Sequence, residues 1–169
     1  MTKGSKKITV AAGSFWPEIG GPVSYLKAII PRIKESGFRV DLVTRSKKNK
    51  YPEDAASGFR IHRLKDWPGR PLNYFRYFLK LLKVAKLSDI IYAQGPVSSG
   101  YPGYLANKFL KKKFVVKITG DYAWEQYSLE NEIIEVLEFQ NKKISGKFNA
   151  LRKIQKKVCQ SADKVIVPS

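Results

Sequence analysis

A glycine-bearing segment near the start of the chain holds the residues best suited to bind an anionic group. Residues 7–12 have the pattern of a short apolar strand, and residues 13–21 then break it with Ser, Pro and three Gly. Pro22 follows Gly20 and Gly21, and from there apolar residues recur at helical spacing. Because a helix N-terminus offers N–H groups and glycine carries no Cβ atom to block an approach, we predict that Gly20 and Gly21 bind an anion. The segment fits neither common glycine-rich phosphate motif, and a plain turn is the alternative.

Two further polar segments follow apolar runs that have the pattern of buried strands. Gln94 ends the run at residues 89–94 and Gly95 follows it, while Gly120 and Asp121 follow the run at residues 114–118. The carboxyl ends of parallel strands meet at one edge of a sheet, and ligands bind beyond that edge. We therefore expect these segments to line one site together with the Gly20–Gly21 loop.

The chain offers little for metal or thiol chemistry. It has one cysteine, Cys159, and one histidine, His62. Cys159 lies in a helical pattern and is predicted to pack, while His62 lies on the polar side of an alternating strand and is predicted to be exposed. A His/Cys metal site needs more ligands than this, and no carboxylate cluster has ligand spacing. We expect neither a metal nor a cofactor.

Apolar residues follow strand spacing and helix spacing in turn along the chain. The predicted strands cover residues 7–12, 38–44, 59–64, 89–94, 114–118 and 164–167. The predicted helices cover residues 22–36, 72–87, 98–110, 130–140 and 148–160. Residues 45–58 are polar and are predicted to be a mobile surface loop. This alternation predicts an α/β domain with a parallel sheet covered on both faces, in which residues 59–64 lie near an edge.

The charge of the chain is strongly positive, because 32 Lys and Arg stand against 14 Asp and Glu, a net charge of +18. Such a surface attracts polyanions. The candidate membrane or polyanion surface comprises Arg76, Lys80, Lys83, Lys147, Arg152, Lys153, Lys156 and Lys157. Lysines that only solubilise the protein are one alternative. Another is a basic, non-catalytic α/β module that binds nucleic acid, although no helix-turn-helix, RRM or KH signature is present.

Three segments together resemble the N-terminal domain of a family 4 glycosyltransferase with the GT-B fold. Residues 15–44 are similar to the family's F-x-P-x-x-G-G loop, first helix and second strand. Residues 115–125, VVKITGDYAWE, resemble the strand and loop that face the cleft, and residues 159–169 resemble the passage to the second domain. The resemblance covers nearly the whole chain in the right order. It implies a Rossmann-like, three-layer α/β/α domain with a mostly parallel sheet, one half of a GT-B fold.

The resemblance also implies an activity and roles for several residues. The activity would be hexosyl transfer, in which a sugar moves from a nucleotide-sugar donor to a glycan or lipid-linked acceptor. The anomeric configuration of the sugar would be retained. Gly20 and Gly21 would approach the donor phosphates, and Asp121 would be the catalytic candidate, with a turn or helix N-cap role as the alternative. The residues expected to line the acceptor cleft are Gln94, Gly95, Gly120, Trp124 and Glu125, with core or lid packing as the alternative for Trp124. Many members have a histidine where Gly120 stands, so its role is not transferred.

The length of the chain and its terminal segments lead to expectations about domain organisation and location. Residues 1–169 are expected to be a single acceptor-side domain, with the C-terminal donor-binding domain absent and the isolated chain inactive. The start of the sequence does not resemble a signal peptide, and no apolar run is long enough to span a bilayer. We expect a cytoplasmic protein that can attach peripherally to the inner face of the membrane.

Overall fold

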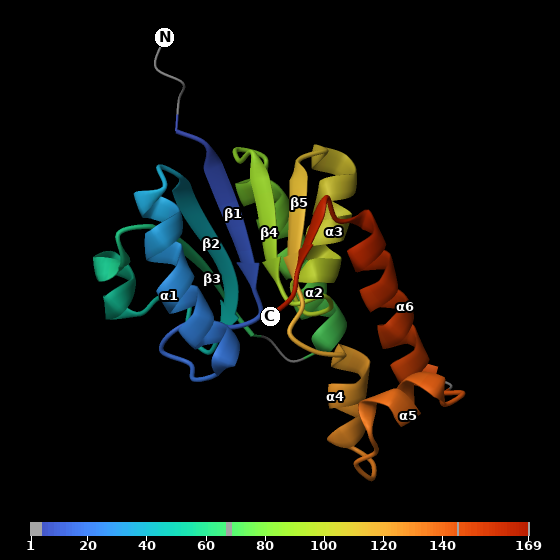
Figure 1. Ribbon diagram of the computed structural model, residues 1–169. Helices are drawn as coiled ribbons and strands as arrows, with labels where there is room; N and C mark the ends of the chain where they lie inside the picture. Colours follow the sequence, from blue (N-terminus) through green and yellow to red (C-terminus); the bar gives the residue numbers. More distant parts are fainter. Residues whose placement is uncertain (1–4, 67–68, 145, 169) are drawn as a thin grey trace.

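Six parallel strands form the centre of the molecule, in the order β3-β2-β1-β4-β5-β6. The computed structural model describes residues 5–66, 69–144 and 146–168. The strands are β1 (Lys7–Ala12), β2 (Arg39–Ser46), β3 (Arg60–Lys65), β4 (Ile90–Gln94), β5 (Lys113–Lys117) and β6 (Lys164–Ile166). All of them run toward the lower edge of the molecule in Figure 1. Successive strands are added on one side of β1 up to β3 and on its other side from β4 onward. The crevice beside the carboxyl ends of the neighbours β1 and β4 is therefore where this topology places a ligand.

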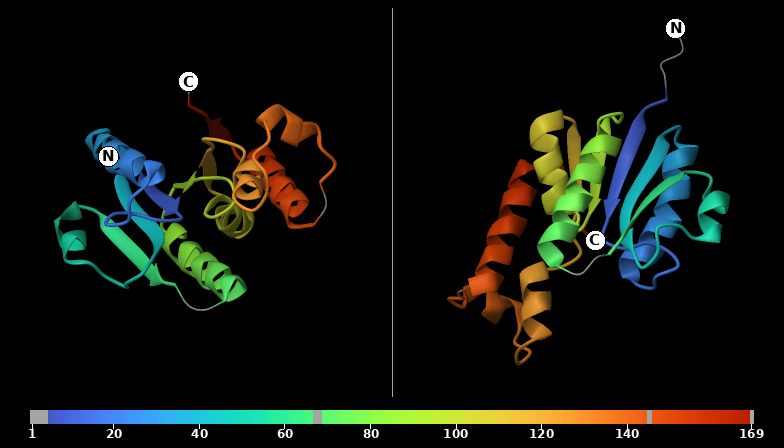
Figure 2. Two further views of the ribbon diagram at one scale, coloured as in Figure 1. Left: turned by 90° about the horizontal axis from the view of Figure 1, so that it is seen from below. Right: turned by 180° about the vertical axis from the view of Figure 1, so that it is seen from behind.

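Helices cover both faces of this sheet. They are α1 (Gly21–Glu35), α2 (Arg70–Ala85), α3 (Gly100–Leu110), α4 (Tyr122–Ser128), α5 (Val136–Asn141) and α6 (Gly146–Ser161), with a 3-10 helix, η1, at Pro52–Ser57. One face packs against α2, α3 and α6, and the other packs against α1, as Figure 2 shows from two sides. The three-layer α/β/α arrangement is therefore confirmed, and every described strand is parallel.

The sheet has an apolar core on each face, because successive side chains of a strand point to opposite faces. Val10 and Leu42 face α1, whereas Ala11 and Val43 face α2 and α3, and all four are fully buried. Near the centre of the second core the buried Tyr77 of α2 donates its hydroxyl to the carbonyls of Ala12 and Val43, at 3.0 and 3.1 Å. These two contacts fix α2 at the carboxyl ends of β1 and β2.

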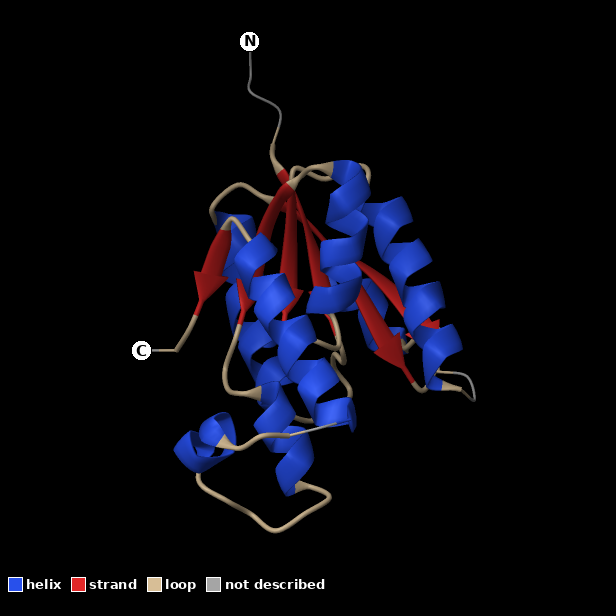
Figure 3. Cartoon of the chain, turned by 90° about the vertical axis from the view of Figure 1, so that its right-hand side faces the viewer, coloured by secondary structure: helices blue, strands red, loops and turns tan. Residues whose placement is uncertain are grey.

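Two predicted stretches differ from the structure. Residues 45–58 are not a structureless loop: β2 extends through Ser46, and η1 is folded against the sheet edge. The predicted helix at 130–140 begins only at Val136, because α4 occupies residues 122–128 and an irregular turn separates α4 from α5. Figure 3 shows α4, this turn and α5 projecting below the sheet. The edge position of β3 is confirmed.

Candidate functional site

The carboxyl edge of the sheet brings together the three segments that the sequence singled out. Ala12, Gln94 and Lys117, the last residues of β1, β4 and β5, are register partners across neighbouring strands. The loops that follow these strands lie along one edge, seen from below in Figure 2. Gly20 and Gly21, Gln94 and Gly95, and Gly120 and Asp121 therefore belong to one region of the molecule.

The Gly20–Gly21 loop leaves the N-terminus of α1 open to an approaching group. The first turn of α1 has no acidic residue, and no side chain caps it. Within the described residues, the amides of Gly20 and Gly21 donate no hydrogen bond. A Cβ atom at Gly21 would meet nothing within 4 Å. The packing of this chain therefore does not require a glycine there, whereas close approach of a ligand would.

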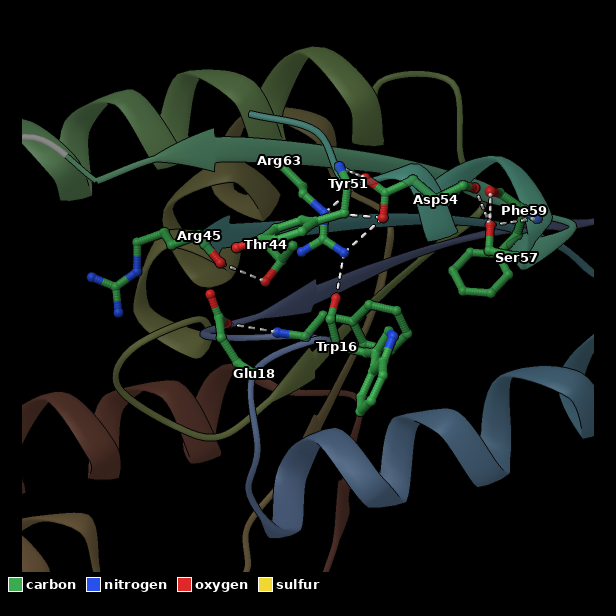
Figure 4. Close-up of polar contacts among 10 residues, drawn as sticks. Trp16, Glu18, Thr44, Arg45, Tyr51, Asp54, Ser57, Phe59 and Arg63 are labelled. Atoms are coloured by element: carbon green, nitrogen blue, oxygen red, sulfur yellow. Dashed lines mark hydrogen bonds and ion pairs between the residues drawn. The ribbon is translucent and has the colours of Figure 1, made fainter. Parts of the chain in front are cut away.

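An ion pair on the edge strand holds this loop in place, as Figure 4 shows. Arg63 of β3, whose side chain is 1% exposed, bonds Asp54 of η1 through Nε at 2.9 Å and Nη2 at 2.7 Å. Its Nη2 also donates to the carbonyl of Trp16. The guanidinium lies 4.6 Å from the centre of the Tyr51 ring. The strand β3, the helix η1 and the glycine loop are thus joined at one side chain.

This ion pair also sets the charge state of Asp54. The hydrogen bonds from Arg63 hold the pKa of the Asp54 carboxyl below its usual range, although burial acts in the opposite direction. The sequence prediction missed this contact. Its only sequence signal is an arginine within an apolar, alternating strand.

Asp121 is the N-cap of α4. Its Oδ1 accepts hydrogen bonds from the amides of Ala123 at 3.0 Å and Trp124 at 3.2 Å. Its Oδ2 accepts none from the described residues. The capping alternative is therefore realised, and the catalytic role of Asp121 stays a prediction that depends on Oδ2.

A second carboxylate lies beside this cap. A Cβ atom at Gly120 would stand 2.6 Å from Oε1 of Glu125, so the Glu125 side chain folds back over the turn. Burial raises the pKa of Glu125, and the nearby Asp121 charge adds to this. The two carboxyl groups can therefore hold a proton or accept hydrogen bonds from hydroxyl groups at the edge of the sheet.

Trp124 has a structural partner. Its indole Nε1 donates to the carbonyl of Ile134 at 2.8 Å and so ties the irregular turn to α4. Gln94 is buried and accepts a hydrogen bond from the Tyr92 hydroxyl at 2.8 Å. Gly95 has a φ of 109°, a conformation that L-residues with side chains rarely adopt, where the chain turns from β4 toward α3.

An apolar cavity of about 440 Å³ opens on the face that carries α2, α3 and α6. The side chains that line it are mainly aromatic and aliphatic, among them Tyr74, Phe78, Tyr101, Leu105, Phe148 and Leu151. Tyr122 and Gln126 of α4 also line it, so the helix capped by Asp121 forms part of its wall. The cavity can hold an apolar chain beside the carboxyl edge.

The predicted basic surface separates into free and engaged residues. Lys83, Lys153, Lys156 and Lys157 are exposed. Arg76 instead donates to the carbonyl of Lys65 at 3.1 Å, and Arg152 donates to the carbonyl of Phe139. Lys147 pairs with Glu130 at the rim of the cavity, and Lys80 is half-buried. Of the four exposed residues in this predicted set whose side chains form no ion pair or hydrogen bond within the described residues, three lie on α6.

The remaining candidates play no part in this region. His62 is less exposed than predicted: its side chain is 25% exposed and its Nε2 lies 3.5 Å from the buried Asp41 carboxylate, since β2 supplies that neighbour. Burial lowers the pKa of His62. Burial also raises the pKa of the Cys159 thiol, in keeping with a packing role. In residues 5–66, 69–144 and 146–168, no cluster of three or more His, Cys, Asp or Glu is arranged to hold a metal, and no helix is long and apolar enough to cross a membrane.

Comparison with solved structures places this architecture among GT-B proteins. UDP-GlcNAc 2-epimerase from Methanocaldococcus jannaschii matches with a TM-score of 0.62 and 14% identity, over 96% of this chain and 39% of that one. MurG from Acinetobacter baumannii matches with a TM-score of 0.59 and 14% identity, over 96% and 41%. Anabaena HepE in complex with UDP matches with a TM-score of 0.62 and 14% identity, over 95% and 36%. The chain spans less than half the length of these proteins, and identities this low show the fold alone.

Sequence comparison adds the family. A search of curated proteins finds no match. The profile described as Glycosyltransferase Family 4 matches residues 19–169, which include the glycine loop, the carboxyl edge and α6. This match covers most of the chain, and the chain belongs to glycosyltransferase family 4.

Proposed function

We propose that this chain is the acceptor-side domain of a retaining hexosyltransferase that moves a sugar from a nucleotide-sugar donor to a lipid-linked acceptor. The family match and the GT-B neighbours support a glycosyltransferase module. The UDP bound to Anabaena HepE supports a nucleotide-sugar donor. In this proposal most donor contacts come from a second domain, and this chain contributes the Gly20–Gly21 amides.

The observation that carries the acceptor class is the apolar cavity beside α4. A glycan alone would not need a cavity lined by Phe78, Phe148 and Leu151. An amphiphile would place its chain there and its polar head at the carboxyl edge, near Asp121 and Glu125. The carboxylates would then orient an acceptor hydroxyl, and Asp121 Oδ2 would be the group that accepts its hydrogen bond.

Titration of the chain with farnesyl diphosphate, an anionic isoprenoid amphiphile, tests the acceptor class. Backbone amide shifts in an NMR titration should change along residues 13–21, in α4 and around the cavity. Leu151→Trp fills the cavity and should weaken binding about tenfold or more, whereas Leu79→Trp, at a position on α2 that is 45% exposed and outside the cavity, should not. Equal binding by both variants would contradict a lipid-linked acceptor.

A transfer assay tests the division of labour between domains. Incubated with a panel of nucleotide sugars and lipid or sugar acceptors, the 169-residue chain should form no product, because the donor-binding contacts are assigned elsewhere. Robust turnover by this chain would show that the acceptor-side assignment is wrong.

A further inference from the structure

Lys117 is a buried cation without a counter-ion at the carboxyl edge. It is the last residue of β5 and is only 8% exposed. Its ammonium lies 2.9 Å from the centre of the Tyr25 ring of α1, which places the side chain on the α1 face of the sheet. Within the described residues, Lys117 forms no ion pair and its Nζ donates no hydrogen bond. The Tyr25 ring is the contact that the structure gives this ammonium, and Nζ itself is not among the fully buried polar atoms, so an anionic ligand can reach it and supply the opposite charge.

Among the described residues, no carboxylate forms an ion pair with Lys117, and Gln94 offers a donor beside it. Gln94 is its register partner on β4 and is 7% exposed. The Tyr92 hydroxyl donates to Oε1 of Gln94, which leaves the Gln94 amide nitrogen as a free donor within the described part of the chain. Burial, with the neighbouring Tyr25 hydroxyl, raises the pKa of Tyr92, so this phenol stays neutral.

The glycine loop lies one helical turn from this cation. Tyr25 follows Gly21 by four residues in α1, and helical side chains lean toward the N-terminus, so the Tyr25 ring and the ammonium above it lie toward the first turn. That turn carries the unpartnered amides of Gly20 and Gly21. The helix geometry thus points to one space for the uncapped N-terminus of α1 and for the Lys117 ammonium, which has no counter-ion among the described residues.

We propose that Lys117 is a phosphoryl-binding residue. Together with the Gln94 amide and the Gly20–Gly21 amides, it binds the diphosphate of a ligand at the carboxyl edge. The proposal rests on the proposed function for the identity of that ligand, which is either the nucleotide diphosphate of the donor or the diphosphate of a lipid-linked acceptor. The shared chemistry, a diphosphate meeting an ammonium and several N–H donors, is the same for both.

Calorimetric titration with inorganic pyrophosphate tests the site without a nucleoside or a lipid chain. Lys117→Met keeps the length of the side chain and removes its charge, and should weaken binding about tenfold or more. Lys117→Arg should retain most of the affinity. The matched control is Lys113→Met on the same strand, whose side chain is 76% exposed, and it should change affinity by less than about twofold.

Thermal unfolding separates this role from a structural one. Lys117→Met should be at least as stable as the wild type, because a largely buried side chain loses a charge that has no counter-ion, and pyrophosphate should no longer raise its melting temperature. Undetectable binding by the wild type at millimolar pyrophosphate, or equal weakening by Lys113→Met and Lys117→Met, would overturn the proposal.

The same variants assign the source of the diphosphate. Selective loss of UDP binding by Lys117→Met supports a donor diphosphate, and selective loss of farnesyl diphosphate binding supports an acceptor diphosphate. Pyrophosphate has no lipid chain to enter the cavity, so a failure at Lys117 leaves the result for Leu151→Trp intact. The two proposals can therefore fail separately.

Discussion

At the scale of single residues, two glycines of the carboxyl edge have opposite relations to the fold. A Cβ atom at Gly100 would stand 2.6 Å from the carbonyl oxygen of Gly95 and 3.1 Å from Val158. Gly100 is therefore needed where α3 begins close to the turn after β4. Gly21 faces open space, so its lack of a side chain serves no contact within the described structure.

This contrast predicts different outcomes for two substitutions. Gly100→Ala should cost about 1–3 kcal/mol of the free energy of unfolding, because backbone atoms must shift. Gly21→Val should change that free energy by less than about 1 kcal/mol and should weaken pyrophosphate binding. Urea unfolding and calorimetric titration measure the two effects. Unchanged binding by Gly21→Val would reduce the loop to a simple connector.

At the scale of elements, one ion pair joins three pieces of chain that have few other polar contacts with one another. Arg63 brings together β3, η1 and the loop before α1 through Asp54 and the carbonyl of Trp16. Asp54 also accepts a hydrogen bond from the amide of Tyr51 at 3.0 Å and so fixes the start of η1. Loss of the Arg63–Asp54 ion pair should therefore loosen both η1 and the glycine loop at Trp16.

Asp54→Asn should therefore destabilise the protein in a pH-dependent way. At pH 7 the cost should be about 3 kcal/mol, because the buried Arg63 loses its counter-ion. The carboxyl titrates near 3.8 when unperturbed and its folded pKa is lower, so the stabilisation is present above pH 3.8 and is lost as the pH falls through the folded pKa. Urea unfolding of both proteins between pH 7 and pH 2 should show the difference shrink below about pH 4.

A neighbouring carboxylate provides the control for this experiment. Glu53 lies on the same turn of η1 and is exposed, and Glu53→Gln should leave stability nearly unchanged. A difference between wild type and Asp54→Asn that stays constant with pH would mean that the ion pair does not stabilise the fold.

At the scale of the whole molecule, the exposed lysines of α6 and the apolar cavity lie on the same face of the sheet. The helices α2, α3 and α6 cover one face of the sheet, and the cavity opens between them. Lys153, Lys156 and Lys157 are exposed on α6, while Phe75 of α2, at the cavity, is 57% exposed. A surface of this kind suits an anionic membrane, which a lipid-linked acceptor would require.

Vesicle cosedimentation tests this arrangement. Binding should rise with anionic lipid content and fall with salt. Each lysine near the membrane contributes about 1 kcal/mol, so reversing Lys153, Lys156 and Lys157 to Glu should weaken binding by about two orders of magnitude. Reversal of Lys47, Lys48 and Lys50, in an exposed loop, makes the same change in net charge and should have a smaller effect. Tight RNA binding without vesicle binding would favour a nucleic-acid module instead.

The sequence by itself determined the order and type of most elements. Strand and helix spacings of apolar residues record which side of each element is buried, and this information is local. The strands at residues 38–44, 89–94 and 114–118 were therefore predicted within two residues of β2, β4 and β5. The same pattern also predicted that the polar segments after these strands lie close together, because the carboxyl ends of parallel strands lie at one edge of the sheet.

Only the tertiary structure decided how side chains meet across that edge. Arg63 reaches Trp16 across 47 residues of sequence, and Lys117 of β5 meets Tyr25 of α1 on one face of the sheet. Neither contact could be predicted from the helix or strand spacing of apolar residues, because each joins segments that are far apart in the sequence. The polar composition of residues 45–58 predicted a mobile loop. The structure differs there because η1 is ordered by Arg63, a side chain that belongs to β3 and lies outside this segment. A charge is buried only where a distant partner or a ligand stabilises it, and the partner is set by the fold.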